Sequence, residues 1–342
     1  MTITDTSADD RKALDSTSVV KKGFFSDPER FALIGVWLIL IVFFTVTVGD
    51  TFLTLANLSN MLGSQAVLLV LALGLIIPLR ANIYDLSMAS VMTLSAVIVA
   101  SGYVLYGWPL WMAVLLALAA GLLVGTINGF IVTKFDIDPF IITLGVGTVV
   151  IGISHIISTS RTVSGVDPFL ADIMLSKPFW GIPLDFWYAV GLCFVVWYLF
   201  EYTAFGQRLL FIGQNPEVAR LNGVNVQRLR WIALMCSGTI GALAGIVLVG
   251  TTLSADTTSG AAFLLPAFAA AFLGSTTIRI GRFNPWGTLI AVYFLVTGIT
   301  GLQLMGAAQY VQQLFYGGAL VIAVVLSKIV RARSEKKRLI IQ

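Results

Sequence analysis

Long apolar runs recur along almost the whole chain, and they limit the folds that it can adopt. An α-helix rises about 1.5 Å per residue, so about 20 apolar residues cross the hydrocarbon core of a bilayer. Runs of that length are separated here by short polar segments. Only 11% of the residues are charged, against about 25% in a typical soluble domain. The pattern predicts an all-α polytopic membrane protein with no separate soluble catalytic domain.

Ten membrane spans are predicted from these runs. Polar residues at the start of the third run leave its first turn undefined. Pro266 in the short eighth run is compatible with a broken or re-entrant segment. The predicted spans are 31–49, 60–79, 86–106, 110–130, 139–158, 186–202, 231–253, 261–275, 286–304 and 311–326.

The basic residues predict the orientation of these spans. With the N-terminus in the cytosol, ten spans also return the C-terminus there. Of the 21 lysines and arginines, only Arg161 and Lys177 then lie outside, which is a split of 19 to 2. One span more or fewer would reverse every later loop and destroy this asymmetry. The net charge of +4 is therefore assigned to the cytosolic face rather than to nucleic acid binding.

The predicted spans form a transmembrane domain over residues 31–328, flanked by two polar ends. Residues 1–30 predict a disordered cytosolic tail rather than a signal peptide, and residues 329–342 form a basic cytosolic tail. Two sets of five spans would give halves of inverted topology, a common transporter plan. No residue-level repeat supports that division.

The external loop 159–185 is the longest predicted segment on the outer side. It carries several acidic residues and a tryptophan, which suit a docking surface for an extracytoplasmic protein. The same residues also suit a plain connector with interfacial aromatics. The residues in question are Asp167, Asp172, Trp180 and Asp185.

The cytosolic loop 205–230 holds four arginines in a chain with few charges. Its stretch NPEVARLNG predicts a short helix, because Asn215 can cap, Pro216 suits the first position and Glu217 favours the positive end of the helix dipole. Gly223 is typical of a helix stop. So short a helix is marginal alone in water. It is expected either to dock against a partner or to lie in the membrane interface.

Few polar side chains lie in or near the spans. A charge inside a membrane is costly and usually functional, although Asp85 could simply cap the third span. Uncharged amides suit the passage of a neutral polyol because they both donate and accept hydrogen bonds. They suit interhelical bonding equally well. The residues expected along a translocation pathway are Asn82, Asp85, Ser87, Asn128 and Gln303.

Glycines recur every four residues on two predicted helices, as Gly121, Gly125 and Gly129 and as Gly241 and Gly245. Small residues at this spacing let membrane helices approach closely, which predicts helix packing rather than a moving gate. No G-x-x-x-x-G-K-[ST] motif, nucleophile–base set or metal-ligand cluster occurs in the sequence. The chain is therefore expected to bind no metal or cofactor itself and not to be an enzyme.

Two stretches resemble the permease subunits of ribose-type ABC sugar importers. Residues 203–247 are similar to the family patterns T-x-x-G-R and G-x-N-x-x-A-A-x-x-x-G-I, and residues 121–149 to G-x-x-x-G-x-x-N-G and P-F-I-x-T-L-G. The chain departs from the family at RANIYDLSMAS (80–90), where G-G-I-D-L-S-V-G is usual, and at LGSTTIRIGRFNPWG (273–287). These departures leave the substrate open.

The resemblance implies a permease subunit that moves a monosaccharide or related polyol inward, with ATP and Mg²⁺ bound by a separate ATPase subunit. It implies that NPEVARLNG is similar to the coupling helix that enters a groove of the ATPase, with Ala219 against that partner. The expected coupling residues are Asn215, Glu217, Ala219, Arg220 and Gly223. An extracytoplasmic substrate-binding protein, a second copy of the permease and membrane lipid are the other implied partners, in the bacterial cytoplasmic (inner) membrane.

Other functions fit the sequence less well. Branched-chain amino-acid permeases share the family plan and are the nearest alternative. An ion-coupled secondary transporter would need paired ionisable groups inside the membrane, and only Asp85 and Glu201 come near that position. A membrane-embedded enzyme is disfavoured, because acids, histidines and metal ligands do not cluster.

Overall fold

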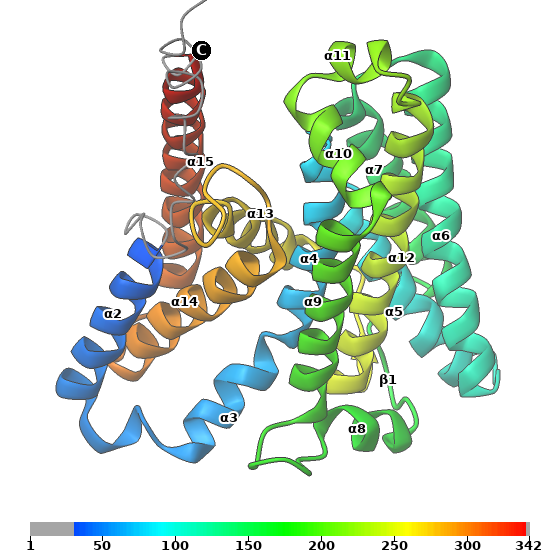
Figure 1. The fold of residues 1–342 in the computed structure, drawn as a ribbon. Helices are drawn as coiled ribbons and strands as arrows, with labels where there is room; N and C mark the ends of the chain where they lie inside the picture. Colours follow the sequence, from blue (N-terminus) through cyan, green and yellow to red (C-terminus); the bar gives the residue numbers. More distant parts are fainter. Residues whose placement is uncertain (1–30, 340–342) are drawn as a thin grey trace, which may run out of the picture.

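The computed structural model describes residues 31–339, with side chains described to residue 327. The predicted tail 1–30 and the last three residues of the predicted tail 329–342 lie outside this range. The described chain is almost wholly helical (Figure 1), which confirms the all-α class. The helices are α2 Ala32–Val48, η2 Gly49–Thr51, α3 Leu55–Ser64, α4 Ala66–Arg80, α5 Met88–Val104, α6 Leu110–Phe135, α7 Pro139–Ile157, α8 Pro168–Leu175, α9 Leu184–Tyr202, α10 Ala204–Gln214, α11 Pro216–Leu221, α12 Val226–Thr252, α13 Ala261–Gly274, α14 Pro285–Leu304 and α15 Tyr310–Leu339.

Each of the ten predicted spans coincides with an apolar helix or helix pair. Within residues 31–339, eight helical segments are long and apolar enough to cross a membrane, and α5 and α13 are shorter apolar helices. The second span bends at Gln65, between α3 and α4. Several helices run past their predicted ends because polar turns continue the helix beyond the apolar run. The spans confirm a multi-pass membrane protein.

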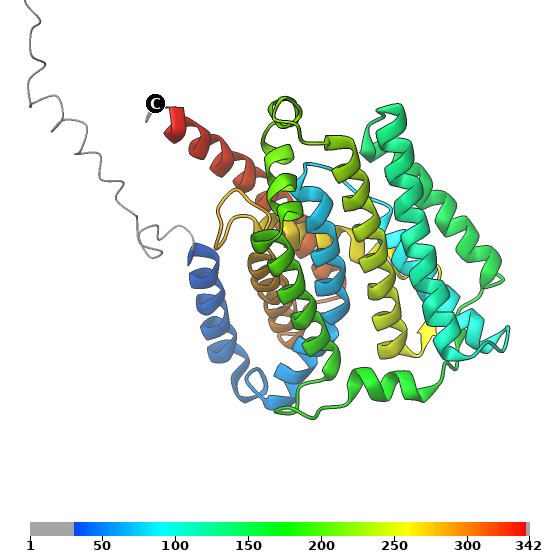
Figure 2. The same cartoon turned by 45° about the vertical axis from the view of Figure 1, so that its right-hand side comes forward.

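The helices define two ends of the molecule. The helices α10 and α11 and the last turns of α15 lie at one end, and α8 lies across the opposite end (Figures 1 and 2). A short antiparallel pair of strands, β1 Val163–Ser164 and β2 Ser254–Ala255, also lies at the α8 end. The positive-inside prediction assigns the α10–α11 end to the cytosol.

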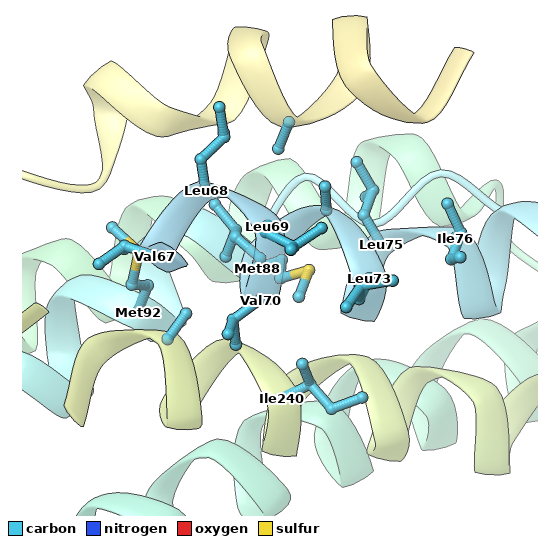
Figure 3. Packing of buried hydrophobic residues seen from close by; sticks show 14 of the residues in the cluster. Val67, Leu68, Leu69, Val70, Leu73, Leu75, Ile76, Met88, Met92 and Ile240 are labelled. Atoms are coloured by element: carbon cyan, nitrogen blue, oxygen red, sulfur yellow. The ribbon is translucent and has the colours of Figure 1, made fainter. Parts of the chain in front are cut away.

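The core is built around α4, which is apolar on every side. All of its residues from Ala66 to Arg80 are buried. Figure 3 shows its leucines and valines packed against Met88 and Met92 of α5 and Ile240 of α12. A helix that is hydrophobic all round is stable only inside a protein or a membrane. By contrast, α2 and residues 310–327 of α15 expose many of their apolar side chains, as helices that face lipid do.

The glycines of α6 form the contact with α12, which runs antiparallel to it. A methyl group on Gly121 would lie 2.5 Å from the carbonyl oxygen of Gly238, and one on Gly125 would lie 2.5 Å from that of Leu234. Gly129 lies against the same helix. Such contacts are possible only without a β-carbon, so the backbones of α6 and α12 touch directly.

The second glycine pair brings α12 against α5. Gly241 lies beside the carbonyl oxygen of Met88, and Gly245 lies against that of Met92. Because residues 88 and 92 meet residues 241 and 245 in the same order, α5 runs parallel to α12. The helix α5 therefore begins more than halfway along α12, deep inside the bundle.

Two membrane crossings are interrupted near their middle. In the first broken crossing, residues 81–104, the chain leaves α4 at the α10–α11 end, runs without helix to Ser87 and then forms α5. In the second broken crossing, residues 253–274, the chain returns from β2 and forms α13 only after Gly260. The Gly260 amide donates to the Thr93 hydroxyl of α5 at 3.0 Å, so the two crossings meet inside the bundle.

The helix α13 has 14 residues, so its length is about 21 Å, short of the ~30 Å hydrocarbon core. Pro266 lies inside it without dividing it. The eighth span is thus a continuous half-helix preceded by the turn at residues 257–260.

Candidate functional site: a buried polar cluster and a surface helix

The non-helical part of the first broken crossing carries a buried carboxylate. Asp85 accepts hydrogen bonds from the Ser87 amide at 3.0 Å and the Ser87 hydroxyl at 2.6 Å. Its other oxygen accepts from the Ser237 hydroxyl of α12 at 2.7 Å. Asp85 is only 1% exposed and lies just before the first turn of α5. It joins the start of α5 to the middle of α12.

Asn128 extends this cluster to α6. Its amide nitrogen donates to the Ser87 hydroxyl oxygen at 2.7 Å, and the residue is completely buried. Its amide oxygen is buried and has no hydrogen-bond partner among the described residues. A buried acceptor without a donor is costly, and this oxygen is the unsatisfied acceptor of the cluster among the described residues.

Thr143 connects the same segment to α7. Its hydroxyl accepts from the Leu86 amide at 3.1 Å and donates to the Tyr84 carbonyl at 3.3 Å. These bonds satisfy backbone groups that the interruption of the helix leaves open, which a membrane interior requires. The polar cluster, defined as Asp85, Ser87, Asn128, Thr143 and Ser237, therefore fixes the non-helical segment against three helices.

Two residues expected on the pathway lie elsewhere. Asn82 is exposed and has φ 60, a left-handed conformation that asparagine tolerates, so it ends α4 rather than joining the cluster. Gln303 lies near the last turn of α14, with its amide 3.5 Å from that of Gln312. Gln303 lies far from the cluster because α14 ends on the side of the molecule opposite α10 and α11 (Figure 1).

Sequence reasoning missed two members of the cluster. Thr143 and Ser237 are common residues whose role appears only when the fold brings their helices beside Asp85. Thr143 is the threonine of the P-F-I-x-T-L-G pattern, and Ser237 lies within residues 203–247, the other stretch that resembles the permease family. The resemblance was therefore the available signal for both residues.

The surface helix α11 forms as its sequence predicts. The Asn215 side chain accepts from the amides of Glu217 at 3.0 Å and Val218 at 3.1 Å, and Pro216 occupies the first helical position. Gly223 has φ 75, and its amide donates to the Arg220 carbonyl at 2.9 Å. Cap, proline and glycine thus define both ends of a helix of six residues.

The position of Ala219 on α11 differs from the expectation that this residue contacts the partner. Ala219 is completely buried against its own chain, so it does not present itself to a partner. Its small size is explained by this intramolecular contact. The outer face carries Leu221, which is 87% exposed, Val218, which is 40% exposed, and the ion pair of Glu217 with Arg220 at 3.5 Å.

The loop at the opposite end is folded rather than extended. Asp167 caps α8 by accepting from the Phe169 amide at 3.0 Å, and Leu170 packs into the core. Asp185 is buried, so it cannot contribute to a docking surface, whereas Asp172 is exposed. Trp180 is 79% exposed and stands beyond the bundle.

Interrupted crossings that meet inside a helical bundle, one of them carrying a buried polar cluster, are typical of membrane transport proteins. The fold and the cluster define the chain as one of that class. The chain belongs to the family described as branched-chain amino acid transport system / permease component, whose model matches residues 57–324.

Curated relatives of the chain include sugar permeases. The ribose import permease protein RbsC of Bacillus subtilis is 31% identical over 292 residues, which cover 85% of this chain and 90% of the relative. The fructose import permease protein FrcC of Rhizobium meliloti is 31% identical over 331 residues, covering 93% and 91%. The galactose/methyl galactoside import permease protein MglC of Salmonella typhimurium is 28% identical over 321 residues, covering 88% and 95%. No solved structure matches the chain significantly.

Proposed function

We propose that the chain is the permease subunit of an ATP-binding-cassette importer that moves a monosaccharide into the cell. ATP and Mg²⁺ bind to a separate ATPase subunit, and the chain itself carries no ATP-hydrolysing site. Its relatives are named as ribose, fructose and galactose import permeases, and they cover most of its length. The family description also includes branched-chain amino acids, which keeps that substrate class as the second candidate.

The exposed apolar side chains of Leu221 and Val218, which are neighbours on one face of α11, carry the partner part of this proposal. Adjoining exposed apolar groups favour a protein contact. Leu221 stands on a helix outside the spans, at the end that the basic residues assign to the cytosol. Val218, Glu217 and Arg220 surround it on the outer face of α11. This face is the proposed coupling surface for the ATPase.

The polar cluster is the proposed inner part of the pathway. The hydroxyls of Ser87 and Ser237 and the amide of Asn128 can exchange hydrogen bonds with sugar hydroxyls without trapping an ion. Both broken crossings begin their helices beside this region, so a small shift of either one changes access to it. Gln303 lies away from it, and its proposed place is the outer entrance.

The remaining partners follow from the same plan. Trp180 and Asp172 at the α8 end form the proposed contact for an extracytoplasmic substrate-binding protein. A second copy of the permease completes the pathway, and the membrane is the bacterial inner membrane. The broken crossings α5 and α13 run in opposite directions, which supports inverted halves of five spans each.

Replacement of Leu221 by aspartate tests the coupling surface. We expect Leu221→Asp to reduce co-purification of the importer's ATPase strongly, because an exposed apolar anchor is lost and a charge must be desolvated. Membrane abundance should stay unchanged, since Leu221 makes little contact with its own chain.

Leu175→Asp is the matched control. Leu175 is an exposed leucine of α8 at the opposite end. It should leave ATPase recovery at the wild-type level. Equal recovery of the ATPase with Leu221→Asp and Leu175→Asp would show that α11 is not the coupling surface.

A further inference from the structure

Arg80 is the last residue of α4 and directly precedes the first broken crossing. Its side chain contacts the turn between α9 and α10. Its Nε donates to the carbonyl of Gly206 in α10 at 3.1 Å, and its Nη2 donates to the carbonyl of Phe200 in α9 at 3.2 Å. The guanidinium also lies over the Phe200 ring, 4.2 Å from its centre. Arg80 is only 5% exposed. The side chain thus holds the corner where α9 turns into α10.

The backbone of Arg80 holds the other end of α10. A methyl group on Gly213 would collide with the carbonyl oxygen of Arg80, so the last turn of α10 rests directly on this residue. At the first turn, Gly206 lies equally close to the backbone of α9. The helix α10 is therefore seated on Arg80 at both ends. It cannot tilt without moving the residue that starts the segment leading to Asp85.

The second broken crossing reaches the same corner. Arg279, in the loop that follows α13, forms an ion pair with Glu201 at 2.5 Å, in the last turn of α9. The Gln207 side chain of α10 donates to the carbonyls of Phe200 and Glu201 at 3.0 and 3.1 Å. Both interrupted crossings thus contact the turn between α9 and α10, and α10 leads from this turn to α11.

We propose that Arg80 and the Glu201–Arg279 pair are positioning residues that transmit movement of α10 and α11 to the two broken crossings. This inference rests on the proposed function, in which α11 receives the ATPase. A push on α11 tilts α10. Arg80 then moves the segment with Asp85, and Arg279 moves α13. Since α5 and α13 meet at Thr93 and Gly260, the two crossings shift together.

Cysteine labelling in the purified complex with the ATPase tests this transmission. The native cysteines are first replaced by alanine (Cys193→Ala, Cys236→Ala), and Tyr84→Cys then reports on the first broken crossing. Tyr84 is 38% exposed and lies between Arg80 and Asp85. The readout is the rate of maleimide labelling with and without ATP plus vanadate.

We expect nucleotide to change the labelling rate in this background. Arg80→Met should shrink that change about tenfold, the size typical of coupling between two sites, while ATPase recovery and nucleotide binding stay at the wild-type level. Arg161→Met, at an exposed arginine near the opposite end, should leave the change intact. Retention of the full change in folded Arg80→Met would overturn the inference and leave the proposed function standing. Failure of the background protein to recover the ATPase would overturn both.

A second pair of variants covers the case in which Arg80→Met does not fold. The Arg279 side chain is 45% exposed, so Arg279→Gln should fold. With Thr258→Cys as the reporter, Arg279→Gln and Glu201→Gln should each reduce the nucleotide-induced change. The double variant should be no worse than either single variant, because both remove one interaction. Additive losses, or no loss, would contradict a role for this pair.

Discussion

Asp85 shows how a single side chain can fix an interrupted helix inside a membrane. Its carboxylate accepts from Ser87 twice and from Ser237 once. These bonds stabilise a turn that cannot use the regular helical pattern. The D-L-S motif indicated that Asp85 and Ser87 matter, but only the fold shows that Asn128 and Ser237 complete their bonding. Such pairings depend on helix register, which a single sequence does not specify.

Asp85→Ala should therefore cost more stability than the loss of an ordinary buried hydrogen bond. It leaves the donors of Ser87 and Ser237 without their acceptor, and we expect the free energy of unfolding to fall by about 1–3 kcal/mol. Ser95→Ala is the control, because the Ser95 hydroxyl donates only to the Ala242 carbonyl, at 2.7 Å. Thermal unfolding in detergent measures both. A smaller loss for Asp85→Ala than for Ser95→Ala would contradict the structural role of the cluster.

The sequence predicted which segments are helical better than it predicted how long each helix is. Strongly apolar runs such as α6 were found because their composition is decisive. The spans predicted at 86–106 and 261–275 agree with α5 and α13 to within two residues at each end. Their meeting inside the bundle was not predicted, because it depends on contacts between helices rather than on local composition. The helix α11 was predicted closely, since its cap and stop are local signals. The inner position of Ala219 was missed, because a six-residue helix has no apolar periodicity long enough to define its faces.

Glycine-to-alanine changes separate close helix contacts from freely placed glycines. Gly125→Ala should destabilise the bundle by about 1–3 kcal/mol, because the new methyl group meets the α12 backbone. Gly152→Ala on α7 has nothing within 4 Å of the new methyl group among the described residues. It should stabilise by about 0.5–1 kcal/mol through helix propensity. Unfolding temperatures that shift alike for the two variants would rule out the proposed α6–α12 contact.

The two ends of the described molecule differ in structure (Figure 1). The α10–α11 end carries a capped surface helix and the corner held by Arg80, whereas the α8 end carries a folded loop with an exposed tryptophan. The predicted asymmetry of basic residues was visible in sequence alone, because it depends only on charge and span count. The joining of both broken crossings at one corner was not visible, because it depends on contacts between residues far apart in sequence, such as Arg80 with Phe200 and Gly206.

Orientation can be measured in intact cells with an impermeant maleimide. In a background without Cys193 and Cys236, Lys177→Cys should be labelled from outside, and Asn222→Cys should be labelled only after the membrane is opened. Both positions are exposed, so access depends on the side of the membrane. Labelling of Asn222→Cys in sealed cells would reverse the assigned topology.

ATP-dependent sugar uptake by the reconstituted importer is the most direct measurement of the proposed activity. Proteoliposomes would hold the permease, its ATPase and its substrate-binding protein, and D-ribose, D-galactose, D-fructose and L-leucine would be supplied in turn. We predict that at least one of the three sugars accumulates only when ATP and Mg²⁺ face the ATPase, and that Leu221→Asp abolishes this uptake. Accumulation of L-leucine alone, or of a sugar driven by a proton or sodium gradient without ATP, would contradict it.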